Sequence, residues 1–223
     1  MTYRHELKHE INLSDMIALR QRLQTVAQSD EHALNGAYEI RSLYFDNLSD
    51  KALREKIDGV SRREKFRIRY YNRDISLIHL EKKSKIGGLG TKESAMLTGE
   101  QAQSIVDGDY GWMAHAPDSL IKELYHKMTT QQLRPKTIVD YTREPYIFTA
   151  GNVRVTIDYN IRTGLLCTDF LNPDCVTVPA GEAPIILEVK WDAYLPDIIR
   201  DAIQLDSRHT CAFSKYAACR IYG

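Results

Sequence analysis

The sequence predicts an α+β fold, in which helices pack on the outside of an antiparallel β-sheet. Two observations support this class. Segments with the two-residue period of a strand often follow one another closely enough to form hairpins, and segments of helical period lie between them in mixed order. The 223-residue chain has no internal repeat, low-complexity tract or Pro/Gly-rich linker, so a single domain over residues 1–223 is expected.

The first half of the chain opens with a strand, expected over residues 3–12, and continues with a helix. Ser14 is the expected N-cap of this helix, and its apolar face carries Met16, Leu19, Leu23 and Val26. Further strands are expected over 38–45, 63–72, 76–85 and 91–96, with a short turn at residues 73 and 74. Further helices are expected over 49–57, from about residue 100 and from about residue 118, where Pro117 occupies a favoured first-turn position.

The second half returns to strands and then ends in helices. The period of two predicts strands over 134–143, 152–158 and 185–190, and helical segments are expected over 195–205 and 214–221. Hydrophobic residues make up 43% of the chain, which is enough for a substantial core.

The overall charge excludes one class of protein. Thirty Lys and Arg balance thirty Asp and Glu, whereas a protein that coats nucleic acid would be basic over its whole surface. No apolar run approaches the roughly 20 residues that a membrane helix needs, and the opening MTYRHELKHE lacks the apolar core of a signal peptide. We therefore expect a cytoplasmic protein without nucleic-acid partners or a membrane segment.

The four cysteines, Cys167, Cys175, Cys211 and Cys219, show no C-x-x-C spacing. Zinc binding and thioredoxin-like chemistry therefore have little support, and the cysteines are expected to be reduced structural thiols.

The stretch KFRIRYY, residues 65–71, has an unusual charged face. If it is a strand, Phe66 and Ile68 point to one side while Lys65, Arg67 and Arg69 point to the other, with no acidic residue between them. Like charges this close repel unless an anion lies among them.

Other predicted strands also carry charged faces: Arg4, Glu6 and Lys8; His79, Glu81, Lys83 and Lys85; Tyr141 and Arg143; Arg154, Thr156 and Asp158; Ile186, Glu188 and Lys190. These faces could meet solvent on an open sheet. Alternatively, they could line a barrel, and so many interior cations would then require a polyanion. Arg and Lys suit phosphate, while the three glutamates could pair with cations or hold a hard divalent metal ion.

Seven motifs occur in one order: HELKHEI at 5–11, IRSLYFD at 40–46, KFRIRYY at 65–71, LEKKSK at 80–85, RVTID at 154–158, LEVKW at 187–191 and FSKY at 213–216. Together they resemble the vacuolar transporter chaperone (VTC) domain, the polyphosphate polymerase branch of the CYTH-like triphosphate tunnel metalloenzymes. Hydrolytic relatives typically begin with E-x-E-x-K, but here Arg4 replaces the first glutamate. This replacement removes a possible metal ligand, which fits the VTC branch better.

The resemblance implies an antiparallel β-barrel that forms a tunnel for triphosphate or polyphosphate, with Mn²⁺ or Mg²⁺ as cofactor. By motif, the implied phosphate ligands are Lys8, Arg67, Arg69, Lys83, Tyr141, Arg143, Arg154, Lys190, Ser214 and Lys215, and the implied metal ligand is Glu188. The residues implied to act in catalysis are Arg67, Arg69, Lys83, Glu188 and Lys215.

The implied activity is ATP-dependent polyphosphate synthesis, a transferase reaction whose partners are ATP and inorganic polyphosphate or triphosphate. A terminal phosphate oxygen is already ionised at neutral pH, so this reaction needs no dedicated general base. Two alternatives stay open: a hydrolase that cuts triphosphate or polyphosphate, and a non-catalytic polyphosphate-binding module.

Overall fold

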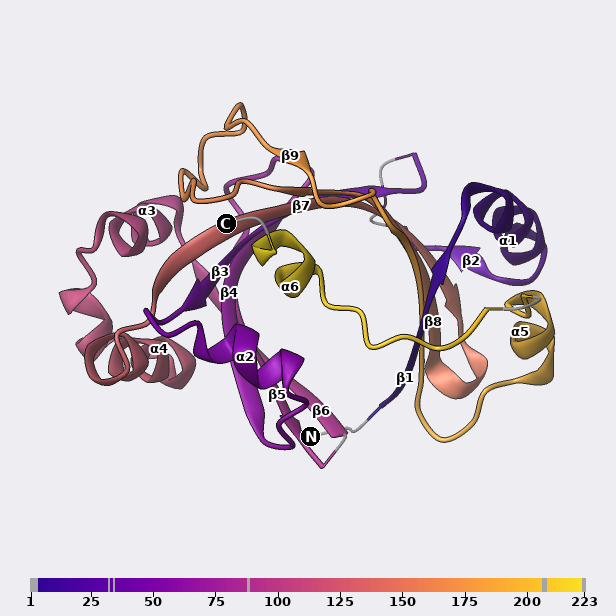
Figure 1. The fold of residues 1–223 in the computed structure, drawn as a ribbon, viewed down its shortest axis with the longest axis horizontal. Helices are drawn as coiled ribbons and strands as arrows, with labels where there is room; N and C mark the ends of the chain where they lie inside the picture. The colour runs from indigo at the N-terminus through magenta and orange to yellow at the C-terminus, as the bar shows by residue number, and fades with distance from the viewer. Residues whose placement is uncertain (1–3, 32, 34, 88, 206–207, 222–223) are drawn as a thin grey trace. The chain divides into compact units, whose positions relative to one another are not determined.

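The computed structural model describes residues 4–31, 33, 35–87, 89–205 and 208–221 (Figure 1). The chain folds into two compact units. Unit 1 comprises Met1–Glu39, Tyr141–Ile161 and Pro179–Phe213, and unit 2 comprises Ile40–Asp140, Arg162–Val178 and Ser214–Gly223. Two of the points at which the chain passes from one unit to the other lie within long strands, β7 (Arg134–Phe148) and β8 (Val153–Thr163).

Unit 1 contains an antiparallel sheet in the order β1 (His5–Ile11), β10 (Ile185–Trp191), β8 and β7. The two-residue strand β2 (Gln28–Ser29) pairs with β7. Helices α1 (Leu13–Val26) and α5 (Asp197–Ala202) pack on one face, and a 3-10 turn, η2 (Ala150–Asn152), connects β7 to β8. Their shared core includes Leu19, Leu23, Val155, Leu187 and Ile199. Because side chains alternate along a strand, Lys8, Arg154 and Glu188 lie on the opposite face of the sheet from these helices.

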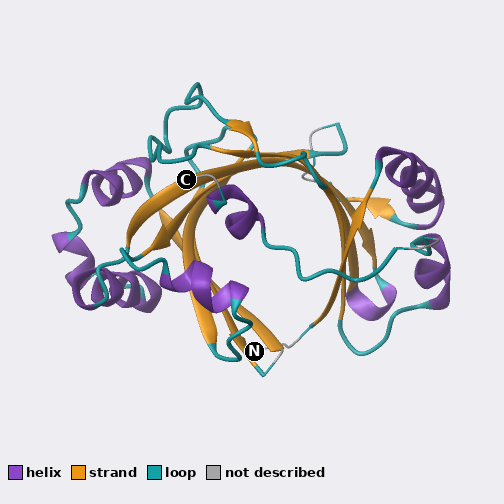
Figure 2. Ribbon diagram, viewed as in Figure 1, coloured by secondary structure: helices purple, strands orange, loops and turns teal. Residues whose placement is uncertain are grey.

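Unit 2 continues from β7 through β3 (Tyr38–Asp46), β4 (Arg63–Tyr71), β5 (Ile78–Ile86) and β6 (Leu89–Leu97), and the pairs from β3 to β6 are antiparallel. Helices α3 (Gly99–Asp107) and α4 (Ser119–Thr130), with the 3-10 helix η1 (Gly111–His115), cover the apolar face (Figure 2). Their core includes Leu43, Phe66, Ile68, Ile105 and Leu124. The remaining elements are α2 (Lys51–Ile57), α6 (Lys215–Arg220) and β9 (Val178–Pro179), which pairs with β8.

The predicted α+β class, with an antiparallel sheet and outer helices, is confirmed. Three local predictions are wrong. Pro117 is not in the first turn of α4, because Asp118 is the N-cap and its side chain accepts from the Leu120 N–H at 2.7 Å. The N-cap of α1 is Asn12 rather than Ser14: the Asn12 side chain accepts from the Asp15 backbone N–H at 2.8 Å, and the Asp15 carboxylate accepts from the Asn12 N–H at 3.0 Å. This capping box satisfies two helix-terminal donors at once. The helix expected over 195–205 is shorter, because Pro196 precedes its first turn and it ends at Ala202.

Most strand boundaries agree with the sequence period, although β7 runs on to Phe148 and β8 to Thr163. Tyr3, the expected start of the first strand, lies outside the described residues. Across the described part of the chain, no helix combines the length and the apolar character needed to span a membrane.

Candidate functional site

Unit 2 carries a buried cluster of two arginines and a glutamate on the face opposite α3 and α4. Arg67 on β4 lies directly across from Glu81 on β5, and its Nε donates to the carboxylate at 2.7 Å. Arg69 NH1 lies 3.7 Å from the same oxygen, and its Nε donates to Ser42 Oγ at 2.8 Å. All three charged side chains are buried. These contacts fix both guanidinium groups in place before any ligand arrives.

Glu81 remains ionised in this cluster. Its burial alone would raise the pKa of the carboxyl group, but Arg67, Arg69 and Lys92 hold the pKa well below its usual range. Lys92 Nζ lies 3.0 Å from the carboxylate. The single carboxylate therefore faces three cations, and the cluster keeps a net positive charge.

A row of lysines crosses the same sheet next to this cluster. Lys83 on β5 lies directly opposite Lys65 on β4 and directly opposite Lys92 on β6. Side chains that lie directly opposite on antiparallel strands are separated by only about 5 Å at their Cβ atoms, and like charges there repel. An anion bound over this row would relieve the repulsion.

Tyr44 on β3 borders the cluster and is strongly affected by it. Its hydroxyl accepts from Arg67 NH1 at 2.7 Å, while Lys65 Nζ lies 5.5 Å from its ring centroid. Burial would raise the pKa of this phenol, but Arg67, Lys65 and Arg69 lower it to about 7. Tyr44 therefore changes its charge near neutral pH, beside a guanidinium that could bind phosphate.

Helix α6 brings Ser214 and Lys215 to this part of unit 2. Ser214 is the N-cap of α6, and its Oγ accepts from the Ala217 N–H at 3.4 Å. The next residue, Lys215, starts the helix, and Tyr216 stacks on Tyr44 with ring centroids 4.9 Å apart.

The carboxylate of Asp46 holds α6 and α2 together. It accepts from the Tyr216 hydroxyl at 2.7 Å and from the backbone N–H groups of Ala52 and Leu53 at 2.9 and 3.1 Å. Asp46 thus caps the start of α2 and positions the first turn of α6, which carries Lys215.

Unit 1 carries a second charged cluster, formed by β1 and β10. Lys8 lies directly opposite Glu188, and Glu6 lies directly opposite Lys190. Lys8 Nζ is 3.3 Å from both carboxylates, and Lys190 Nζ contacts both as well. Burial would lower the pKa of Lys8, but Glu188 and Glu6 raise it well above its usual value, so Lys8 remains protonated.

Arg143 and Arg154 flank this second cluster. Arg143 makes a bidentate contact with the fully buried Asp158, at 2.6 and 2.7 Å, and its guanidinium lies 5.5 Å from the Tyr141 ring centroid. Arg154 lies directly opposite Lys190 and contacts Asp30 at 3.2 Å through NH2. Among the described residues, the buried Arg154 Nε has no hydrogen-bond partner, so it retains a donor for a ligand.

Glu188 is a suitable ligand for a divalent metal ion, but it does not complete a metal site by itself. Within the described residues no group of three His, Cys, Asp or Glu side chains could hold a metal ion. However, Glu6 and Glu188 contact the same two ammonium groups, so two carboxylates converge here. Mg²⁺ is commonly held by one or two carboxylates, with substrate phosphate and water completing the coordination. The residues present therefore fit a metal ion that arrives with phosphate.

The structure groups the predicted residues within each unit. Arg67, Arg69, Lys83, Ser214 and Lys215 lie in unit 2, and Lys8, Tyr141, Arg143, Arg154, Glu188 and Lys190 lie in unit 1. Sequence reasoning gave no role to several residues that contact them: Tyr44, Asp30 and Asp158 contact predicted cations, and Lys92 contacts Glu81. Lys92 could have been found from its place on the predicted strand at 91–96, but it is the only cation on its face of that strand.

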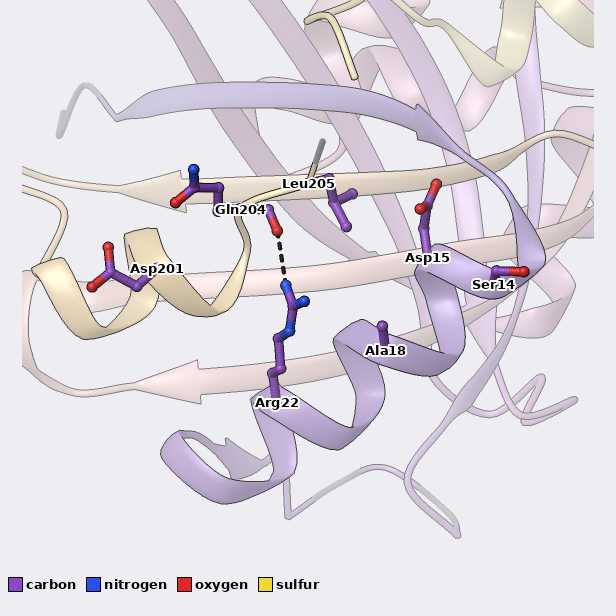
Figure 3. A pocket seen from close by; sticks show the side chains of 7 residues that line it. All are labelled: Ser14, Asp15, Ala18, Arg22, Asp201, Gln204 and Leu205. Atoms are coloured by element: carbon purple, nitrogen blue, oxygen red, sulfur yellow. Dashed lines mark hydrogen bonds between the residues drawn. The ribbon is translucent and has the colours of Figure 1, made fainter. Parts of the chain in front are cut away.

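A cavity of about 430 Å³ elsewhere in unit 1 does not contribute to this site (Figure 3). It lies between α1 and the segment after α5, on the helical side of the sheet, and none of the predicted site residues lines it. Arg22 donates across it to the carbonyl of Gln204 at 2.8 Å, and Asp15 is engaged by Arg208 at 2.7 Å. Its lining has one cation, Arg22, which is already engaged, and two acids, Asp15 and Asp201, so the cavity lacks the surplus positive charge that a polyphosphate ligand needs.

Tyr44 leads to a prediction about pH. Its phenolate, formed above about pH 7, would repel a phosphate ligand from Arg67. Between pH 6 and 8, roughly one unit either side of that pKa, tripolyphosphate affinity should therefore fall relative to that of a Tyr44→Phe variant. Tyr216 remains neutral over this range because burial and Asp46 raise its pKa. Burial would raise the pKa of Tyr71, but Arg69 lowers it. Both proteins contain Tyr71, so it cannot cause a difference between them.

The measurement is calorimetric titration of both proteins across this pH range, with tyrosinate absorbance as a second readout. The lowered pKa of Tyr44 also makes the free energy of unfolding depend on pH. Because the folded pKa is depressed, ionisation of Tyr44 adds stability above the unfolded pKa of about 10, and this contribution is lost as the pH falls through about 7. A parallel pH dependence of affinity in the two proteins would exclude Tyr44 as the titrating group.

Comparison with known proteins identifies the family. A model of the VTC domain matches residues 3–221. Among solved structures, the fold is similar to a putative adenylate cyclase from Bacillus halodurans, with a TM-score of 0.54, 13% identity and coverage of 85% of this chain and 80% of that one. The PH1012 protein from Pyrococcus horikoshii OT3 aligns over 97% of this chain and 99% of its own, with 12% identity and a TM-score of 0.49. No curated protein matches the chain. Since the family model spans nearly all of the sequence and both units, the chain belongs to the VTC domain family.

Proposed function

We propose that this protein is a metal-dependent polyphosphate polymerase that transfers the terminal phosphoryl group of ATP to the end of a polyphosphate chain. The observation that carries the proposal is the row of Lys65, Lys83 and Lys92 beside two buried, oriented arginines in unit 2. Such a surface suits a ligand with several closely spaced negative charges better than a ligand with one. Membership of the VTC family and the fold likeness support a phosphate-polymer or triphosphate ligand.

The arginines and lysines would bind and orient the phosphate groups. Arg67 and Arg69 are already held by Glu81, Ser42 and Tyr44, so little side-chain entropy is lost when phosphate oxygens replace part of these contacts. Unit 1 has its own cluster of cations, Lys8, Lys190 and Arg143, which would also bind phosphate. Cations in such positions stabilise the charge that spreads over a transferring phosphoryl group.

The reaction needs no dedicated general base. A terminal oxygen of the polyphosphate chain, already ionised, attacks the γ-phosphorus of ATP. The bond from that phosphorus to the bridging oxygen of ADP breaks, and ADP leaves with the electron pair. Glu188 and Glu6 would hold Mn²⁺ or Mg²⁺, whose charge is shared with the phosphate oxygens. The same site could admit water as the attacking group, and hydrolysis is therefore the competing activity.

Incubation with ATP and Mn²⁺ tests this proposal directly. Long polyphosphate chains together with equimolar ADP and newly formed phosphoanhydride bonds are expected. Free phosphate without polymer would show a hydrolase instead. Tight tripolyphosphate binding without turnover of ATP would show a binding module, and either result would overturn the proposed synthesis.

Ligand binding should also raise thermal stability. Tripolyphosphate at about 100 times its dissociation constant adds roughly 2.7 kcal/mol to the free energy of unfolding, because it binds the folded state alone. For a chain of this size that corresponds to a rise in melting temperature of about 5–10 °C. Differential scanning calorimetry would measure it, with sodium chloride at matched ionic strength as the control. The rise should shrink at high salt, since screening weakens the cation–phosphate attraction.

A further inference from the structure

Two cysteines with seven residues between them in the sequence meet in unit 2. Cys167 and Cys175 have their Sγ atoms 2.9 Å apart, and both side chains are partly accessible to solvent. The sequence offered no reason to pair them, because their spacing matches no common two-cysteine motif. All four cysteines are free thiols in this structure.

The chain between the two cysteines is anchored to the sheet. The Phe170 carbonyl accepts from the Tyr70 hydroxyl at 3.1 Å, and the two rings lie 4.9 Å apart. The Asn172 carbonyl accepts from Arg41 NH1 at 2.5 Å. Arg41 in turn makes a bidentate contact with Asp140, with both distances 2.9 Å. These anchors hold the segment folded back on itself, so the approach of the two thiols follows from the tertiary structure.

The distance between the sulfur atoms favours redox chemistry over metal binding. A disulfide bond is about 2.05 Å long, so only a small movement would join the two atoms. Two thiolates on a tetrahedral zinc ion, each about 2.3 Å from the metal, would be about 3.8 Å apart. The pair at 2.9 Å is closer than one metal ion would hold it. In addition, the described residues contain no third Cys, His, Asp or Glu that would complete a metal site.

We propose that Cys167 and Cys175 are a thiol-modification site, which forms a reversible intrachain disulfide on reaction with a low-molecular-weight disulfide such as oxidised glutathione. The Cys167 thiolate attacks one sulfur of the oxidant and releases one thiol, which leaves a mixed disulfide. The Cys175 thiol then loses its proton and attacks Cys167 Sγ, which releases the second thiol. Two protein thiols lose two electrons and two protons, and the oxidant is reduced to two thiols.

The environment of the pair supports this order of events. Burial, followed by the hydrogen bond and the charge of Cys167, raises the pKa of Cys175 to about 12. Cys175 is therefore the thiol that reacts second. Once Cys167 is in a mixed disulfide, its negative charge no longer opposes ionisation of Cys175, whereas the nearby Arg41 still favours it.

The disulfide would form on the face of the unit 2 sheet that packs against the hydrophobic core. It would leave the cluster of Arg67, Arg69 and Glu81 on the other face unchanged. Arg41 and Tyr70 lie directly opposite each other on β3 and β4, while Ser42 and Arg69 form the next pair along. Because successive side chains point to opposite faces, the anchored segment lies on the other face of the sheet from Arg69. Phe170, Cys167 and Cys175 accordingly pack with the hydrophobic core of unit 2. The inference therefore does not depend on the proposed polymerase activity.

The test uses the full chain, treated with oxidised glutathione and then mapped by mass spectrometry. The thiol count is expected to fall from four to two, with Cys167 and Cys175 joined in one peptide, and dithiothreitol should restore all four. Cys211→Ser is the matched control and should still lose two thiols. Cys167→Ser should form no intrachain disulfide and should accumulate glutathione on Cys175 at most.

Further readouts separate the site from nonspecific oxidation. Closing so short a loop should raise the melting temperature by about 5–10 °C, and tripolyphosphate affinity should change less than twofold. Glutathione spread over all four cysteines without a 167–175 link would overturn the proposal. Protection of both thiols by added Zn²⁺, with stoichiometric zinc binding, would also overturn it in favour of a metal site.

Discussion

Replacing Arg67 and Arg69 with glutamine, in a protein that also carries Glu81→Gln, is expected to weaken tripolyphosphate binding by about 10²–10⁴-fold. Each hydrogen bond from a charged donor contributes roughly 1.5–3 kcal/mol, and about 1.4 kcal/mol corresponds to a factor of ten in affinity. The triple change removes both guanidinium groups and their buried carboxylate together. Isothermal titration calorimetry with tripolyphosphate measures the effect.

The third substitution is needed because of how the arginines are held. A double alanine variant removes no core volume, and from the sequence it would be expected to leave the fold intact. In the structure, however, it would leave the buried Glu81 carboxylate with Lys92 as its remaining cation among the described contacts. Removing one side of a buried ion pair typically costs about 3–5 kcal/mol, so a loss of binding could then reflect unfolding.

Two controls separate the role of the arginines from a general effect of charge. Glu81→Gln alone should bind tripolyphosphate more tightly than the unmodified protein, because it removes an anion that competes for both guanidinium groups. Lys122→Ala removes an exposed cation on α4 and should bind as the unmodified protein does. Unchanged affinity in a folded triple variant would show that phosphate binds elsewhere.

Glu188→Gln is expected to reduce polyphosphate synthesis by about 100-fold or more while leaving tripolyphosphate binding in place. A divalent metal ion held by Glu188 would supply several kcal/mol of transition-state stabilisation, and the amide is a poor substitute for the carboxylate. The lysines that contact Glu188 keep their charge and can still attract phosphate. Synthesis is measured across a Mn²⁺ titration, and Mn²⁺ binding in the presence of tripolyphosphate is followed by electron paramagnetic resonance.

Glu6→Gln is the matched comparison, since Glu6 contacts the same two lysines but its side chain is 36% exposed, against 6% for Glu188, so a smaller loss of synthesis is expected. If the two carboxylates only balanced the charge of Lys8 and Lys190, neither variant would lose Mn²⁺ binding in the presence of tripolyphosphate. Synthesis at the unmodified level in Glu188→Gln would require another metal ligand, with Glu6 and Glu81 as the next candidates. Melting temperatures of both variants show whether each remains folded.

The sequence by itself determined the strands and the charges on their faces. A period of two is a local property. Strong alternation in KFRIRYY places Arg67 and Arg69 on one side of their strand, and alternation in HLEKKSK places Glu81 and Lys83 on one side of theirs, whatever the rest of the chain does. The order of seven motifs likewise identified the family without any knowledge of contacts. The end of a short helix such as α5 was less certain, because it depends on Pro196 and on packing.

Only the tertiary structure decided which charges meet. Strand register places Glu81 opposite Arg67 and Lys83 between Lys65 and Lys92, and register depends on pairing between distant segments. Asp158 and Asp46 look like ordinary strand residues in the sequence, yet one fixes Arg143 and the other positions α6. The same holds for Cys167 and Cys175, which meet because Arg41 and Tyr70 anchor the chain between them. A local pattern specifies the direction of a side chain along its own strand, but its partners come from segments that only folding brings together.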